Sequence, residues 1–77
     1  RYEDLDVEAV ELKVSPDSHF INNNYNISDV PKTLSVAAIV RDDDIIIPNE
    51  KSKIIENDEL LLFLKPNDIK KAESLFK

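Results

Sequence analysis

The residues with the clearest capacity for chemistry lie together in the middle of the chain, at Arg41-Asp42-Asp43-Asp44. Several carboxylate oxygens within a few residues suit a hard cation such as Ca²⁺, and Glu50 follows closely enough to contribute another. The run lacks the glycine and the ligand spacing of a calcium loop, however. The favoured interpretation is a solvated hairpin tip that also discourages edge aggregation, and no metal site is predicted.

Arg41 has two interpretations, because a guanidinium can bind a phosphate in bidentate fashion or form a salt bridge to a neighbouring aspartate. Ile47 and Pro48 likewise suit either an apolar floor under a purine ring or ordinary core packing. His19 is the sole histidine and the chain has no cysteine, so a ligand cluster around it is not expected. We interpret His19 as a turn residue, with a ligand or pH-sensing contact as the alternative.

No catalytic constellation is found in the sequence. A serine, histidine and aspartate at suggestive spacing, a glycine-rich phosphate loop and carboxylate pairs framed by apolar residues are all missing. The sequence therefore predicts a protein that is not an enzyme.

A predicted β-hairpin spanning residues 34–48 would position these residues, with two apolar runs on either side of the Arg-Asp-Asp-Asp turn. A strict period of two would place Leu34, Val36, Ala38 and Val40 on one face and Ser35, Ala37, Ile39 and Arg41 on the other. Residues 60–64 form a third run, in which every residue is apolar. A sheet that is apolar on both faces must be covered on both, and so short a chain has too few helices to do it.

The remaining elements complete an α+β domain. Residues 7–14 alternate as an edge strand with one wetter side, and a short helical turn is predicted from Tyr25 to about Asp29, capped by Asn24 and ended by Pro31. Asn22 is the candidate left-handed residue, since the chain has no glycine. Pro66 begins a final helix, whose apolar stripe consists of Ile69, Ala72, Leu75 and Phe76. The predicted fold is a small mixed or antiparallel sheet of about four strands with a short helix and a C-terminal helix, forming a sandwich in a dimer.

Composition narrows the choice of partners. The 77 residues have room for one small core, and without cysteine a partner subunit is the remaining way to support it. The net charge of −6 disfavours nucleic acid, and no apolar run is long enough to span a bilayer, so direct membrane insertion of this segment is not expected. Residues 1–6 are interpreted as a linker or frayed end and residues 7–77 as one domain, excised from a longer protein because the chain begins with arginine.

The order of the pieces resembles the C-terminal regulatory domain of the TrkA type, also called RCK-C, in cation transport proteins. The resemblance rests on VEAVELKVSPDS, Asp29-Val30-Pro31, LSVAAIVRDD, IIIP, ENDELLLFLKP and the closing amphipathic helix, and it covers Val7 to Phe76. Where the family usually has glycine, this chain has Asn22, Asp43 or Asp44, and Asn57, which best tolerate left-handed conformations. His19 stands where the family commonly has proline.

The resemblance implies a cytoplasmic domain, held at the inner face of the cell membrane by its parent protein, that regulates K⁺ or Na⁺/H⁺ transport. It also implies a homodimer, a membrane cation transporter or channel subunit as partner in cis or in trans, and cyclic di-AMP as a possible ligand at the dimer interface. The rim expected to bind a nucleotide consists of Ala38, Val40, Arg41, Ile47, Pro48 and Asn49. Two alternatives are a structural oligomerisation module without a small-molecule ligand, and an α/β module that binds a basic peptide through its negative surface.

Overall fold

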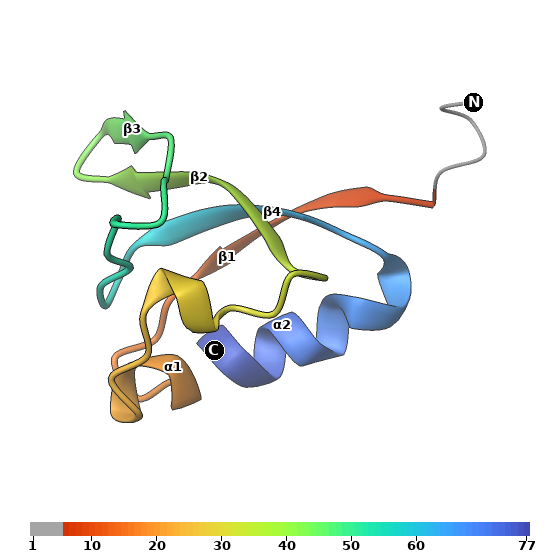
Figure 1. Ribbon diagram of the computed structural model, residues 1–77, viewed down its shortest axis with the longest axis horizontal. Coiled ribbons are helices and arrows are strands. Elements are labelled where there is room, and N and C mark those ends of the chain that lie inside the picture. Colours follow the sequence, from red (N-terminus) through yellow and green to blue (C-terminus); the bar gives the residue numbers. More distant parts are fainter. Residues whose placement is uncertain (1–5) are drawn as a thin grey trace.

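The structure, a computed structural model that describes residues 6–77, has a four-stranded sheet with its helices packed on one face (Figure 1). Its elements are β1 (Glu8–Lys13), α1 (His19–Asn22), the 3₁₀ turn η2 (Ile27–Asp29), β2 (Ser35–Arg41), β3 (Asp44–Ile46), β4 (Glu59–Leu64), the 3₁₀ turn η3 (Pro66–Asp68) and α2 (Ile69–Phe76). All pairings are antiparallel, in the order β1-β4-β2-β3. The predicted α+β class is confirmed, while most of the predicted linker lies outside the described residues.

The core lies between the sheet and the helices. On β4, Leu60, Leu62 and Leu64 alternate toward this inner face and are almost completely buried. Phe20 of α1 and Phe76 of α2 meet beneath them, with ring centroids 5.3 Å apart, and both rings are buried. Burial of each such side chain stabilises the fold by about 1.5–3 kcal/mol, so this one layer of helix on sheet accounts for much of the stability of the chain.

A β-bulge in β2 corrects the predicted assignment of residues to faces. Val36 pairs with Leu62, and Ala38 pairs with Leu61, which is the residue of β4 adjacent to Leu62. Two steps along β2 thus match one step along β4, so Ala37 is an extra residue in β2. Val36 therefore packs against the core, whereas Ala38 and Val40 point to the opposite, outer face. The strict period of two predicted for residues 34–41 is wrong beyond Val36, because a bulge shifts the alternation by one residue.

Non-glycine residues in left-handed conformation form the turns of this glycine-free chain. Asp42 and Asp43 have φ values of 49° and 70° in the β2–β3 turn, Asn24 has a φ of 53°, and Asn57 has a φ of 69° before β4. Asn57 and Asp43 are confirmed as predicted. Asn22 and Asp44 are not left-handed, since Asn22 lies within α1 and Asp44 begins β3.

The helical segment after β1 begins earlier than predicted. Ser18, which is fully buried, caps α1 by accepting a hydrogen bond from the Ile21 backbone nitrogen at 3.2 Å. His19 starts this helix rather than occupying a turn, and only Ile27–Asp29 of the predicted Tyr25–Asp29 turn is helical, as a 3₁₀ turn with Asn26 at its N-cap. The C-terminal helix is confirmed: Ala72 and Phe76 are buried, and Ile69 and Leu75 are half-buried against the core.

Candidate functional site

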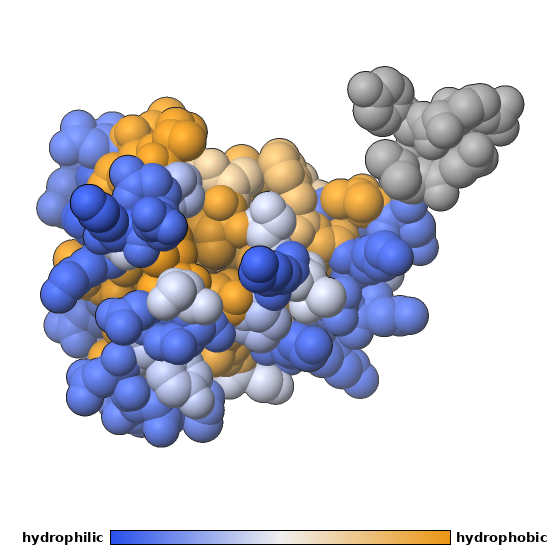
Figure 2. Space-filling model, viewed as in Figure 1, coloured by the Kyte–Doolittle hydropathy of each residue, from blue (hydrophilic) through white to orange (hydrophobic). Residues whose placement is uncertain are grey.

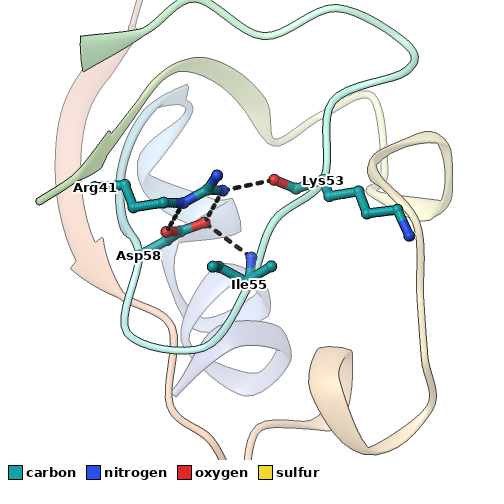
Figure 3. Close-up of polar contacts among 4 residues, drawn as sticks. All are labelled: Arg41, Lys53, Ile55 and Asp58. Atoms are coloured by element: carbon teal, nitrogen blue, oxygen red, sulfur yellow. Dashed lines mark hydrogen bonds and ion pairs between the residues drawn. The ribbon is translucent and has the colours of Figure 1, made fainter. Parts of the chain in front are cut away.

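An ion pair between Arg41 and Asp58 joins the end of β2 to the loop that precedes β4. Arg41 ends β2, and its Nε and a terminal nitrogen donate to the two carboxylate oxygens of Asp58 at 2.8 and 2.9 Å (Figure 3). The Asp58 side chain is only 1% exposed, whereas Arg41 is 32% exposed. The bidentate geometry fixes the guanidinium against the loop before β4.

The same two side chains hold the loop that follows β3. Arg41 also donates to the carbonyl oxygen of Lys53 at 2.9 Å, and Asp58 accepts from the Ile55 backbone nitrogen at 2.8 Å (Figure 3). The backbone of Asp58 and Asn57 in turn bonds Val14, just after β1, at 2.8 and 2.7 Å. The buried carboxylate of Asp58 therefore connects β2 to the 53–58 loop, and the backbone of Asn57 and Asp58 connects this loop to the residue after β1.

The pKa of Arg41 lies above its ordinary value. The hydrogen bond to Asp58 is the main cause, with further attraction from Asp58 and Asp42, while partial burial acts in the opposite direction. The guanidinium is therefore permanently charged. Of the two interpretations of Arg41, the structure supports the salt bridge, but with Asp58 rather than the adjacent aspartates.

The six residues predicted to form a ligand rim are divided among three places. Ala38 and Val40 lie on the outer face of the sheet, and Ile47, just after β3, is 74% exposed. Pro48 and Asn49 line a groove of about 390 Å³ beside η2 and the start of β2. Arg41 is engaged with Asp58, so a single chain does not bring the six together around one cavity.

The outer face of the sheet carries a stripe of apolar side chains that the helices do not cover. Across β1, β4, β2 and β3 the cross-strand pairs join Ala9 to Phe63, Leu61 to Ala38 and Val40 to Ile45. Phe63 is 46% exposed and Ile45 is 72% exposed. We call this set, together with Ile47, the outer apolar stripe. Figure 2 shows apolar surface running along the upper side of the molecule, where β3, β2 and β4 lie.

The part of the chain that the structure describes contains neither a cluster of metal-ligating side chains nor a membrane-spanning helix. Within residues 6–77 no three histidine, aspartate or glutamate side chains gather closely enough to hold a metal ion. Asp42, Asp43 and Asp44 are all exposed at the hairpin tip, as predicted. Across the same residues, no helix has both the length and the apolar character needed to cross a bilayer.

Comparison with known proteins decides the family. The sequence matches the TrkA-C domain over residues 9–77. The chain belongs to the TrkA-C domain family. It is 31% identical over 70 residues to the Trk system potassium uptake protein TrkA homolog 2 of Methanosarcina mazei, a match that spans 91% of this chain and 16% of that protein. It is 30% identical to the TrkA homolog 1 of the same organism, over 91% of this chain and 17% of the relative.

This TrkA-C domain thus spans about a sixth of the length of the curated relatives it matches. The resemblance inferred from the sequence is confirmed at the level of the family. The role of Asp58 was missed by sequence reasoning, although Asn57-Asp58 is among the motifs that carry the resemblance. The available signal was an aspartate directly after an asparagine that favours the left-handed conformation, just ahead of the apolar run 60–64.

Proposed function

We propose that this domain is a regulatory module of a K⁺ or other monovalent cation transport system, and that it works as a homodimer that binds a nucleotide between its subunits. The family and the names of the relatives support the transport system. The uncovered outer apolar stripe supports the dimer, and it is the observation on which the proposal mainly rests. The domain would act in the cytoplasm, at the inner face of the membrane, through a transporter or channel subunit in cis or in trans.

A second copy is the partner that we assign to the outer apolar stripe. The stripe has the composition of an interface centre, with Phe63, Leu61 and Ile45 exposed in part or in full. Charged residues lie at one corner, where Lys13 and Glu59 are cross-strand partners and Glu11 faces Leu61. A two-fold interface places the same patch on both subunits, so these charges would form a polar rim around an apolar centre.

Dimerisation also offers a way to complete the divided ligand rim. Ala38, Val40 and Ile47 lie on the outer face or beside it, whereas Pro48 and Asn49 line the adjacent groove. Residues from two subunits could then enclose a ligand that one subunit cannot. Cyclic di-AMP is the first ligand to test, and binding would bias the population between two dimer arrangements, which an attached transporter subunit would sense.

The dimer is tested by analytical ultracentrifugation at micromolar concentration. We expect wild type to sediment as a dimer and Phe63→Glu to sediment as a monomer, since a buried carboxylate at the interface would be unpaired. Ile55→Glu is the matched control, because Ile55 is 43% exposed but lies away from the outer face, and it should remain dimeric. A monomeric wild type would exclude the proposed dimer.

Ligand binding is tested on the same samples by thermal shift and calorimetry with cyclic di-AMP and a panel of other nucleotides. We expect cyclic di-AMP to raise the unfolding temperature of wild type and to have a weaker effect on Asn49→Ala. A flat response across the panel in a protein that still dimerises would favour the structural oligomerisation module. Binding of a basic peptide by a monomer would instead favour the α/β module that binds such a peptide through its negative surface.

A further inference from the structure

A second concave site lies away from the outer apolar stripe, on the side of the sheet that carries the helices. It is a hollow of about 350 Å³ between the segment that joins α1 to η2 and the loop 53–56. None of the six predicted rim residues lines it. A volume of this order is within the range of small-molecule pockets.

The wall on the α1 side is fixed by local hydrogen bonds. The buried Ser18 caps α1, and the backbone nitrogens of Asn24 and Tyr25 donate to the carbonyl oxygens of Ile21 and Phe20, each at 3.1 Å. The Tyr25 ring packs edge-on against Phe20, with centroids 5.9 Å apart. This wall is therefore formed before any ligand enters.

The opposite wall is fixed by the Arg41–Asp58 pair. Arg41 holds the carbonyl oxygen of Lys53 and Asp58 holds the backbone nitrogen of Ile55, as described above. These bonds leave the side chains of Lys53 and Glu56 exposed. Figure 3 shows the Lys53 side chain extending from the loop toward the segment between α1 and η2, which is the other wall of the hollow.

The lining combines an apolar floor with opposite charges. Phe20 and Ile54 are buried beneath the hollow, and Tyr25 and Ile55, at 36% and 43% exposure, stand at its sides. Lys53 and Glu56 supply one positive and one negative charge, three residues apart on the same wall. A nucleotide phosphate would gain from Lys53 but meet the Glu56 carboxylate, so net anionic ligands fit poorly.

We propose that this hollow binds a free α-amino acid with an apolar side chain, with its carboxylate at Lys53, its ammonium group at Glu56 and its side chain over Phe20 and Ile54. Each part of such a zwitterion meets a group of complementary character, and the walls need no rearrangement to receive it. The site is independent of the proposed dimer and of its nucleotide. Only the exposed side chains of Lys53 and Glu56 have to become ordered on binding.

The experiment is a titration of the ¹⁵N-labelled 77-residue chain with leucine and with phenylalanine, followed by amide chemical shifts. We expect saturable shifts in residues 53–56 and 24–26. N-acetyl-leucine, which lacks the ammonium group, and leucine amide, which lacks the carboxylate, should each bind about two- to fivefold more weakly, the loss expected for one exposed ion pair.

Lys53→Gln and Glu56→Gln should each weaken leucine binding by about the same factor. Lys51→Gln and Glu50→Gln are the matched controls, because both residues are exposed in the same loop and outside the lining, and they should bind as wild type does. Phe63→Glu should also bind leucine normally, which separates this site from the proposed dimer. The proposal is wrong if no saturable shift appears at millimolar ligand, if both blocked analogues bind as leucine does, or if the two lining variants match the controls.

Discussion

Asp58 is the residue on which the local structure of this domain depends most. Its carboxylate accepts three hydrogen bonds, two from Arg41 and one from the backbone of Ile55, while its own backbone bonds Val14. A buried carboxylate is stable only when its oxygens are satisfied in this way. Asp58 therefore positions Arg41 of the predicted ligand rim and the 53–56 wall of the hollow beside α1, although it lines neither site.

Asp58→Asn should lower the free energy of unfolding by about 2–4 kcal/mol, because the amide cannot accept from all three donors and leaves Arg41 without its counter-charge. Chemical denaturation of wild type and variant measures this difference. Asp17→Asn, at an exposed turn, is the control and should change stability by less than about 0.5 kcal/mol. Equal stability of the two variants would contradict the role assigned to Asp58.

The raised pKa of Arg41 predicts how stability responds to alkaline pH. A base whose pKa is higher in the folded state stabilises the fold at every pH below its unfolded value, and loses that contribution only as the pH rises through the folded value. The ion pair should therefore remain intact up to pH about 10, well below the pKa of any arginine.

Arg41→Lys makes this prediction measurable. Lysine has an ordinary pKa of about 10.4 and cannot form the bidentate contact, so the variant should be less stable than wild type at pH 7. Pairing with Asp58 would raise the pKa of this lysine in the folded state, so the variant should fall further behind wild type only as the pH rises above about 10.4. Thermal unfolding at a series of pH values gives the comparison. A stability difference that stays constant from about pH 9 to about pH 11.5 would contradict it.

Local turn chemistry could be predicted from single residues, but long-range pairing could not. Asn57 and Asp43 were correctly expected to be left-handed, because few other residue types tolerate that conformation. The partner of Arg41 was predicted among its neighbours, yet it lies 17 residues away. That pairing depends on the register between β2 and β4, which no local pattern reveals.

Among the elements, β4 shows most clearly how burial differs between the two faces of the sheet. Leu62 is fully buried on the inner face, and its neighbour Phe63 is 46% exposed on the outer face. Leu62→Ala should therefore cost about 2–5 kcal/mol of unfolding free energy, whereas Phe63→Ala should cost about 1 kcal/mol or less in the monomer. Urea unfolding at low protein concentration tests this, and similar losses for the two variants would contradict the assignment of the faces.

The bulge in β2 shows where reasoning from sequence pattern stops. The apolar run of residues 36–40 is compatible with either face, because small and aliphatic side chains follow one another without a polar marker. The inserted residue, Ala37, is detected only through the pairing of Val36 and Ala38 with consecutive residues of β4. Strands with a polar side, such as β1, were assigned correctly.

At the scale of the whole molecule, one sheet face is covered by helices and the other is not. If a second copy covers the outer apolar stripe, folding and association are linked, and the unfolding temperature must rise with protein concentration. We expect this rise for wild type and its absence for Phe63→Glu, measured by calorimetry over a hundredfold concentration range. If the unfolding temperature of wild type did not depend on protein concentration, the outer apolar stripe would remain uncovered.

The strand order β1-β4-β2-β3 also determines when the molecule can assemble during synthesis. β4, one of the two central strands, is the last strand made, so neither β1 nor the β2–β3 hairpin can pair with it until residues 59–64 have left the ribosome. Pairings between segments so far apart in sequence slow folding, because a long loop must close before any contact rewards it. The nascent chain therefore leaves the apolar side chains of β1 and of the β2–β3 hairpin uncovered until β4 is made, and such transiently exposed surface favours aggregation.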